Sequence, residues 1–374
     1  MDYNKKAIAL HKKHKGKIEI KLKTPINNKE ALSTVYTPGV AEVSRQIHND
    51  EKKAYQLTMK ANSLAIVSDG SAVLGLGNIG ALAAIPVMEG KAALFKKFAD
   101  IDAFPICVKT QKSEEIIQLV ENISPNFAAI NLEDISAPRC FEIEEKLQNI
   151  GIPVMHDDQH GTAVVVLASL INGLKIVKKD IAKIKIVING AGSAGYAILK
   201  LLRSAGAKNF LICDTKGIIY SNRVDIKNNA YKRDIAKITN KKNIAGGLRD
   251  ALKNADVFIG VSAPNILKKE WVKYMNEKPI IFALANPIPE ILPPNALDGG
   301  AFIAATGRSD FPNQINNALA FPGIFRGAID AMALRITEKM KLAASFAIAD
   351  FIKTPRKNNF IPAVLNKKVH LAVA

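Results

Sequence analysis

The chain has 374 residues, of which 48% are apolar, and a formal net charge of +18. This length exceeds what one hydrophobic core usually organises, so we expect two domains. No apolar run reaches the roughly 18 residues of a membrane span, and the N-terminus has no signal-peptide core, which together predict a cytoplasmic protein with no membrane partner.

The positive charge does not by itself indicate a nucleic-acid-binding protein. The lysines occur as doublets along the whole chain rather than on one segment, and no aromatic residues alternate with them. Such a charge suits the attraction of small anions, for example a dicarboxylate or a dinucleotide. The three cysteines, Cys107, Cys140 and Cys213, are far apart, which argues against a disulfide framework and against a thiolate metal site.

The first part of the chain reads as a polar, partly helical segment followed by an α/β domain. Residues 1 to about 60 are broken at Pro25 and at 37–39. Short apolar runs then alternate with amphipathic stretches, the pattern of a parallel sheet with crossover helices. The predicted strands are 64–67, 103–108, 127–131 and 152–155, and the predicted helices are 113–123 and 138–149. The apolar stretch 162–177, after Gly161, predicts a buried helix between domains.

A second alternation starts at Ile184 and has the doubly wound pattern. The predicted strands are 184–189, 210–214, 257–261, 280–283 and 302–304, with a helix over 196–205. From Phe321 onward the chain predicts helices that fold back on the first domain. We therefore expect an α/β fold with an N-terminal domain over 1–160, a Rossmann-type dinucleotide-binding domain over 161–320 and a C-terminal helical segment over 321–374.

Two glycine motifs of the form GxGxxG occur, and their contexts differ. The run 75–80 is followed by Pro86 and Gly90, which would interrupt a crossover helix, so we interpret it as a substrate-side loop or a packing turn. The run 190–195 follows a strand and opens a helix, and Asp214 ends the next strand about 20 residues later, which predicts a dinucleotide site. Its candidate cofactor-binding residues are Gly190, Gly192, Ser193, Ala194, Gly195 and Asp214. Asp214 would repel the 2′-phosphate of NADP and so favours NAD, whereas Lys216 acts in the opposite direction.

Two acid pairs, Glu133-Asp134 and Asp157-Asp158, follow predicted strands directly. The carboxyl ends of parallel strands meet at one edge of a sheet, where such folds place ligands, and carboxylates suit Mg²⁺ or Mn²⁺. The alternative is that each pair caps the helix that follows it. A zinc site of His156 and His160, which are four residues apart, is disfavoured because Gly161 is a poor helix residue and the two rings would not share one helical face.

At these residues the chain resembles malic enzymes of the small prokaryotic type. The matching runs are YTPGVAE at 36–42, SDGSAVLGLGNIG at 68–80, PVMEGKAALFKKFADIDAFPI at 86–106, NLEDISAPRCFEIE at 131–144, HDDQHGTA at 156–163, FALANPIPE at 282–290 and ATGRSDFPNQINNALAFPGIFRGA at 305–328. The resemblance covers roughly residues 32–349, and residues after Lys353 match poorly. It implies a homodimeric enzyme that oxidises L-malate with NAD or NADP and Mn²⁺ or Mg²⁺, releasing pyruvate and carbon dioxide.

The resemblance also assigns roles to single residues. It implies that Glu133, Asp134 and Asp158 hold the metal, that Lys91 is the general base paired with Asp157, and that Tyr36 is the general acid. Asn286 and Asn317 would hydrogen-bond the substrate carboxylate or the cofactor amide. Larger relatives carry a substrate-clamping arginine where this chain has Ala72, so the carboxylate anchor stays unassigned. Malolactic conversion of malate to lactate and an inactive dinucleotide-binding regulator remain as alternatives.

Overall fold

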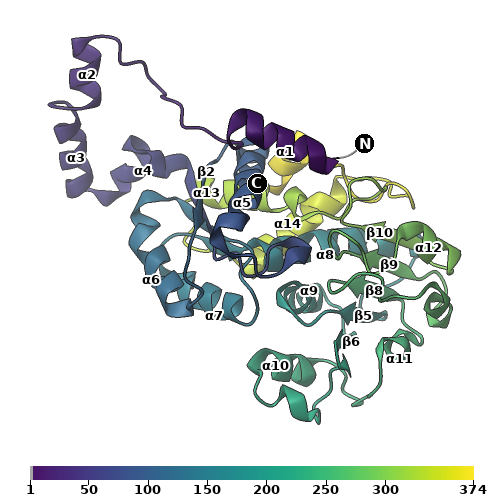
Figure 1. Cartoon of the computed structure of the whole chain (residues 1–374). Coiled ribbons are helices and arrows are strands. Elements are labelled where there is room, and N and C mark those ends of the chain that lie inside the picture. Colours follow the sequence, from purple (N-terminus) through teal and green to yellow (C-terminus); the bar gives the residue numbers. More distant parts are fainter. Residues whose placement is uncertain (1–2) are drawn as a thin grey trace.

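The computed structural model describes residues 3–374, which form two β-sheets with helices packed around them (Figure 1). The first sheet has four parallel strands in the order β2-β1-β3-β4. Their bounds are β1 Ser63–Ser68, β2 Asp102–Cys107, β3 Ala129–Leu132 and β4 Val154–His156. Because β2 and β3 lie on opposite sides of β1, the loops after β1 and β3 leave the sheet at its topological switch point, where ligands bind in open α/β sheets.

Three helices connect the strands of this sheet: α5 Gly80–Ala99, α6 Ser113–Ile123 and α7 Arg139–Lys146. The expectation that Pro86 and Gly90 would interrupt the first of them is wrong, because α5 runs through both. Proline removes one backbone donor from a helix. The apolar face of α5 includes Met88 and Phe95, both fully buried, and its packing maintains the helix despite that loss.

The second sheet has six strands in the order β10-β9-β8-β5-β6-β7. Their bounds are β5 Lys185–Asn189, β6 Asn209–Asp214, β7 Gly217–Ile218, β8 Val257–Gly260, β9 Ile280–Ala283 and β10 Ile303–Thr306. Only β7, at the edge, pairs antiparallel among these strands. The helices of this part are α9 Ser193–Ser204, α10 Ala230–Ile238, α11 Leu248–Leu252 and α12 Pro293–Asp298. The doubly wound prediction is confirmed, and its switch point lies between β5 and β8.

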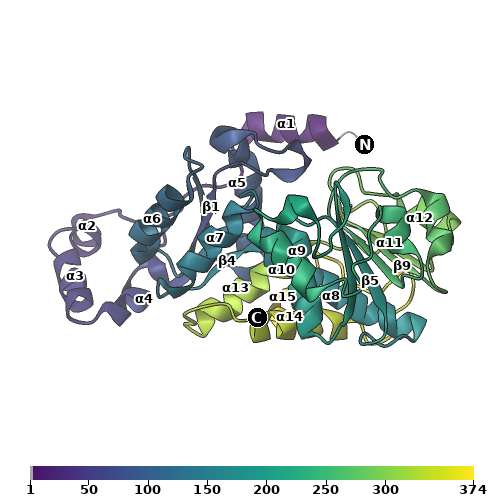
Figure 2. The same ribbon diagram turned by 90° about the horizontal axis from the view of Figure 1, so that it is seen from below.

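One long helix, α8 Asp157–Val177, lies between the two sheets (Figure 2). The sequence predicted its start after Gly161, which is wrong, because the helix already includes His160 and Gly161. By length and composition α8 is the single described helix that could span a membrane, but 72% of its apolar window is buried inside the protein. It is therefore a core helix.

The C-terminal segment folds back on the first sheet, as predicted. Its helices are α13 Phe321–Asp330, α14 Glu338–Asp350 and α15 Lys367–Val373. Phe321 and Phe325 of α13 pack edge-on against Phe95 of α5, with ring centroids 4.8 and 5.5 Å apart. Helix α14 packs along α8. The predicted domain border at 160/161 falls inside α8, so this helix belongs to the cores of both halves.

The N-terminal segment differs from the rest of the protein in its packing. It contains α1 Tyr3–His14, α2 Lys29–Val35, α3 Val40–Asn49 and α4 Ala54–Leu57, and none of these helices contributes a buried residue. Helix α1 lies near α5, whereas α2 and α3 stand away from both sheets in both views (Figures 1 and 2). The predicted breaks at Pro25 and 37–39 both lie outside these helices.

Candidate functional site

The strand register brings the two acid pairs together. Leu132, the last residue of β3, is paired with His156, the last residue of β4. The residues that follow, Glu133 and Asp157, therefore leave the sheet side by side. The backbone N–H of Asp134 donates to Asp158 Oδ2 at 2.8 Å, which ties the two pairs to each other. Neither following helix is capped by an acid, because the N-cap residues of α7 and α8 are Pro138 and His156. The helix-capping alternative is therefore not supported.

Lys91 reaches this acid cluster from α5. Its Nζ lies 2.6 Å from Asp157 Oδ2 and 2.7 Å from Glu133 Oε1, and 4.2 Å from the centre of the Phe321 ring. Lys91 is only 8% exposed. The sequence pattern alone could not distinguish Lys91 from the other lysines, because its role depends on which face of α5 is turned to the carboxyl end of the sheet.

Two further residues fix the Asp157 carboxylate. Asn317 Nδ2 donates to Asp157 Oδ2 at 2.6 Å, so Asn317 belongs to the site but contacts an acid of the protein. Gly161 lies one helical turn after Asp157, and a Cβ there would come within 1.8 Å of Asp157 Oδ1. A side chain at position 161 would displace this carboxylate, which explains why a helix-breaking residue is present inside α8.

Burial and mutual contact perturb the ionisation of this cluster. Burial disfavours the charged form of Lys91, but Asp157, Glu133 and Asp158 outweigh it, so the pKa of Lys91 is raised. Burial raises the pKa of Asp157 and of Asp158 to about 6, and it also raises the pKa of Glu133. Three carboxylates, those of Asp157, Glu133 and Asp158, thus share one ammonium group. Such a cluster is short of positive charge and would be stabilised by a cation.

The donor set fits a hard divalent cation. One oxygen each from Glu133, Asp134 and Asp158 lie within 4.8 Å of one another, and Glu133 and Asp134 are buried. Carboxylate oxygens are the ligands that Mg²⁺ and Mn²⁺ prefer. Asn131 Nδ2 donates to Glu133 Oε2 at 2.8 Å and thereby orients one of the three side chains. These are the three residues that the resemblance implied.

An arginine that the sequence did not single out ties two site loops together. Arg139 Nη1 donates to Asp69 Oδ2 at 2.7 Å, and its Nη2 donates to Ser71 Oγ at 2.9 Å. A backbone hydrogen bond also joins these two loops: the N–H of Ala72, in the loop after β1, donates to the carbonyl oxygen of Asp134, in the loop after β3, at 2.9 Å. Arg139 therefore fixes the loop after β1 against the loop that carries Asp134.

The two histidines of HDDQH do not form a metal site with each other. His156 is fully buried, whereas His160 Nε2 donates to Glu144 Oε2 at 2.9 Å and His160 Nδ1 accepts from Lys341 Nζ at 3.0 Å. Glu144 also accepts from the backbone N–H of His156 at 3.0 Å. This partly buried network holds the first turn of α8, and sequence reasoning missed it because its members come from α7, α8 and the distant α14.

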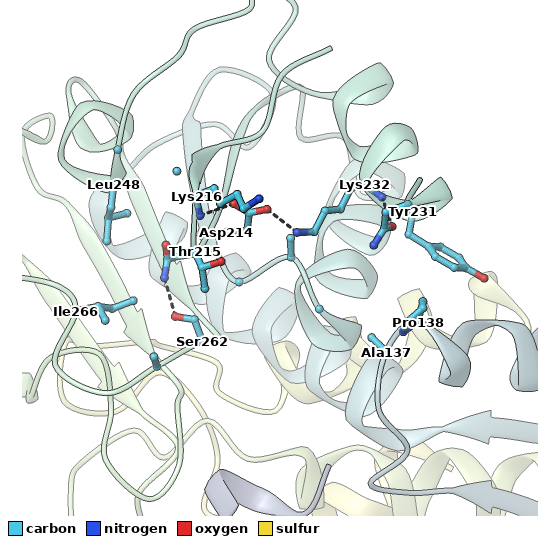
Figure 3. A pocket seen from close by; sticks show the side chains of 18 of the residues that line it. Ala137, Pro138, Asp214, Thr215, Lys216, Tyr231, Lys232, Leu248, Ser262 and Ile266 are labelled. Atoms are coloured by element: carbon cyan, nitrogen blue, oxygen red, sulfur yellow. Dashed lines mark hydrogen bonds and ion pairs between the residues drawn. The ribbon is translucent and has the colours of Figure 1, made fainter. Parts of the chain in front are cut away.

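The glycine loop 190–195 lines a cavity of about 760 Å³ between the two halves (Figure 3). Gly190 and Gly192 line it from the second sheet, and Ala137 and Pro138, which follow Glu133 and Asp134 in the chain, line it from the first. Ser193 and Ala194 open α9 at its edge. A Cβ at Gly195 would lie 1.8 Å from the carbonyl oxygen of Gly190, so close packing of loop and helix requires glycine there.

Asp214 lines the cavity at the end of β6, as predicted, but both of its oxygens have protein partners. Arg223 donates to Oδ1 and Oδ2 at 2.9 Å each. Lys232 Nζ donates to Oδ2 at 2.6 Å (Figure 3). The N–H of Lys216 donates to Oδ1 at 2.9 Å. Burial acts against the charged carboxylate, but the hydrogen bonds from Arg223 and Lys232 outweigh it and lower the pKa of Asp214.

Two predicted site residues lie apart from the acid cluster. Tyr36, at the end of α2, is 68% exposed, and α2 stands away from the sheets (Figure 1). Asn286 is exposed after β9, and its carbonyl oxygen would lie 2.3 Å from a Cβ at Gly75. The Asn286 loop of the second half therefore contacts the loop after β1, which places the first glycine motif at the junction of the two halves.

Comparison with known proteins identifies both halves. A family model described as "Malic enzyme, N-terminal domain" matches residues 15–115 and 110–148, and one described as "Malic enzyme, NAD binding domain" matches residues 159–373. The second match reaches the C-terminal helices, so the expectation of a poor match after Lys353 is wrong.

Individual relatives match over almost the whole chain. A "NAD-dependent malic enzyme" of Geobacillus stearothermophilus is 56% identical over 95% of this chain and 74% of its own length. A "Bifunctional malic/malolactic enzyme" of Bacillus subtilis is 52% identical over all of this chain and 92% of its own length. The crystal structure of a NAD-dependent malic enzyme from Thermotoga maritima has 53% identity and a TM-score of 0.95, covering 98% of this chain and 97% of that one.

Proposed function

The chain belongs to the malic enzyme family, and we propose that it performs the family reaction, the NAD(P)-linked oxidation and decarboxylation of L-malate to pyruvate, through the Lys91 cluster. The observation that carries this assignment of residues is the contact of one buried amine with Asp157 and Glu133 beside a three-carboxylate donor set. A base, its partner acid and a place for a Lewis acid are thereby within reach of one small substrate.

Glu133, Asp134 and Asp158 would hold the divalent cation, and the cavity beside Gly190 would hold the dinucleotide. When bound, the cation polarises the hydroxyl oxygen and later the ketone oxygen of the substrate, and the nicotinamide accepts the hydride. Ala137 and Pro138 line the dinucleotide cavity and follow Asp134 closely in the chain, which supports placing the two reactants side by side.

Lys91 would accept the proton of the malate hydroxyl group as hydride leaves the carbon that carries this hydroxyl. To act as a base the amine must be neutral, while its pairing with Asp157 and Glu133 favours the charged form. Glu133 would serve as a metal ligand in the working enzyme, which would weaken its pairing with Lys91. Asp157, held by Asn317, would remain the ion-pair partner of Lys91. It would keep the Lys91 side chain in position and would balance the positive charge of the protonated amine.

Loss of the distal carboxylate from the resulting β-keto acid leaves an enolate, which requires a proton at carbon. Tyr36 would donate this proton, as the resemblance implies. Asn286, on the loop that contacts Gly75, would hydrogen-bond the substrate or the cofactor amide. Both assignments depend on groups that lie outside the Lys91 cluster in a single chain.

The reaction is tested by incubating the purified protein with L-malate and Mn²⁺ together with NAD or NADP. Reduced dinucleotide and pyruvate should form in equal amounts. Lys91→Ala should lower kcat by about 100-fold or more, the usual contribution of a general base, and should leave dinucleotide binding intact. Lys97→Ala, an exposed lysine on the same helix, is the matched control. Full turnover by Lys91→Ala would reject the assignment.

Malolactic conversion is a second candidate function, because the Bacillus relative carries both activities in its name. In that reaction the dinucleotide would be reoxidised on the protein, and lactate would accumulate in place of pyruvate. Product analysis in the same assay separates the two. An inactive regulator would bind dinucleotide without forming either product.

We also propose that the cavity accepts NADP as well as NAD. The charge of Asp214 is matched by Arg223 and Lys232, so the carboxylate no longer provides a strong repulsion toward a 2′-phosphate. Lys216 and Lys232 also line the cavity, and the side chain of Lys216 is 67% exposed. Because Lys232 is paired with Asp214, the ammonium group of Lys216 is the one that would supply positive charge for a phosphate at this edge. The cytoplasmic location expected from the sequence stays a prediction.

A further inference from the structure

Glu290, in the loop after β9, is a fully buried acid that has no cationic partner. Three other buried acids each form an ion pair with a basic side chain: Asp69 with Arg139, Asp157 with Lys91 and Asp256 with Lys179. Within the part of the chain that the structure describes, no lysine, arginine or histidine forms an ion pair with Glu290. Burial of an unpaired charge is costly, so its presence calls for a physical reason.

The contacts of Glu290 are those of an ionised carboxylate. Its Oε1 accepts from the backbone N–H of Ser262 at 2.8 Å and from the hydroxyl of Ser262 at 3.2 Å. Its Oε2 accepts from the backbone N–H of Ala285 at 3.1 Å. All three partners are donors, so a protonated carboxyl group would find no acceptor among them. Burial raises the pKa of Glu290, but these hydrogen bonds act in the opposite direction.

Glu290 lies directly behind the wall of the cavity that contains the glycine loop. Ser262 lines this cavity, and so does Asn189, the last residue of β5. Asn189 Nδ2 donates to the Ser262 hydroxyl oxygen at 2.6 Å (Figure 3). A Cβ at Gly260, the last residue of β8, would lie 2.4 Å from the carboxyl carbon of Glu290. Glycine at this strand end therefore makes room for the carboxylate, which only Ser262 separates from the cavity.

The strand order places the nicotinamide half of a dinucleotide on this side of the cavity. In doubly wound sheets the pyrophosphate lies at the switch point, and the two nucleotide halves extend over the strands on either side of it. Asp214 ends β6 and marks the adenosine side, so the nicotinamide would extend over the ends of β8 and β9. Glu290 contacts Ser262 after β8 and Ala285 after β9. Its charge is therefore located under this half of the cavity.

We propose that the charge of Glu290 makes the protein bind the oxidised dinucleotide in preference to the reduced one. This inference rests on the proposed function, because it takes the cavity as the dinucleotide site. The oxidised nicotinamide ring carries a positive charge, which it loses when it accepts a hydride, that is, two electrons and one proton. A fixed anion in a poorly screened interior stabilises the charged ring and does little for the neutral one. The reduced product would accordingly dissociate more readily than the oxidised cofactor.

The dissociation constants of NAD and NADH, measured by isothermal titration calorimetry without malate, test this inference. The quantity to compare is the Kd for NADH divided by the Kd for NAD. Glu290→Gln should lower this ratio by about 10-fold, the order expected for two charges roughly 10 Å apart at an effective dielectric constant of about 20. Glu290→Asp keeps the charge and should keep the ratio near that of the wild type. Glu277→Gln, the same change at an exposed acid of the same half, should leave both constants unchanged.

The ratio separates an electrostatic role of Glu290 from a purely structural one. If Glu290 only held the loops after β8 and β9 together, Glu290→Gln would weaken the binding of both forms equally, which would overturn the inference. Ser262→Ala removes one hydrogen bond of Glu290 but not its charge, so it should change both constants in parallel. A wild-type protein that binds neither form would instead overturn the placement of the dinucleotide in the proposed function.

A second variant keeps the inference testable if circular dichroism shows that Glu290→Gln does not fold. Glu290→Ala would leave a buried space at the position of the carboxylate, which a formate ion can fill. Added formate should then strengthen the binding of NAD more than that of NADH. Formamide, which is similar in shape but neutral, should not restore this preference. Equal effects of formate and formamide on the ratio would contradict a role for the charge.

Discussion

Gly161 illustrates how closely single residues are fitted around the acid cluster. A Cβ at this position would lie 1.8 Å from Asp157 Oδ1 and 3.2 Å from the Cβ of Asn317. Gly161→Ala should therefore rotate the Asp157 carboxylate away from Lys91 and lower kcat by about 100-fold, the usual effect of a misplacement near 1 Å. Steady-state kinetics with malate would measure this.

Gly173→Ala is the matched control, because it lies in the same helix and its Cβ would meet only side-chain methyl groups, the nearest being one of Ile280 at 3.2 Å. Its turnover should stay near that of the wild type. Equal activity of the two variants would show that Asp157 does not need its present position.

Cofactor choice is also decided by single charges. Lys216→Ala should raise KM for NADP by about 10-fold, because a charge-assisted contact to the 2′-phosphate is lost, and should change KM for NAD little. Lys227→Ala, exposed and outside the cavity lining, is the control. The same change in KM for both dinucleotides, or no reduction of NADP by the wild type, would contradict the proposed acceptance of the 2′-phosphate.

At the scale of elements, the first turn of α8 depends on a residue of another helix. Glu144 of α7 is 8% exposed and accepts from the backbone of His156 and from the side chains of Gln159 and His160. Burial acts against its charge, but contacts to His160 and Lys341 outweigh burial and lower the pKa of Glu144 to about 2. Burial also lowers the pKa of His160, which favours the neutral ring that donates through Nε2.

Glu144→Gln should lower the free energy of unfolding by about 2 kcal/mol at neutral pH, since hydrogen bonds to a buried charge are lost. Because the pKa of Glu144 falls from 4.5 in the unfolded chain to about 2, this difference should be complete above about pH 4.5 and should shrink as the pH falls toward 2. Denaturant titrations over this range measure it. Glu145→Gln, at the exposed neighbouring position, should show no such difference.

Most elements could be predicted from the sequence, and the errors have physical causes. Strands such as Ile280–Ala283 are short apolar runs whose burial follows from composition. The start of α8 was placed too late because Glu144, on the preceding helix α7, stabilises a turn whose local propensity is poor. The acids could be placed because they follow strands directly. The contact of His160 with Lys341 could not, because it joins segments 181 residues apart, and the contact of Asp214 with Arg223 could not, because it depends on the course of the loop between them.

At the scale of the whole molecule, one apolar core extends across both halves. It contains Ile66 of the first sheet, Ile186 of the second, and side chains from α8, α13 and α14. We therefore expect one thermal transition, with far-UV and near-UV circular dichroism changing at the same temperature. Bound dinucleotide should raise that temperature for both signals. Two separate transitions would show that the halves unfold independently.

The position of α8 has a consequence for evolution and engineering. Its first turn carries Asp157 and Asp158, while its later turns pack against α9 and α14. Chimaeras that combine the malate half of one homologue with the dinucleotide half of another would have mismatched surfaces wherever the crossover point divides this helix from its neighbours. Recombination should therefore succeed only when α8 is inherited together with the segments that enclose it.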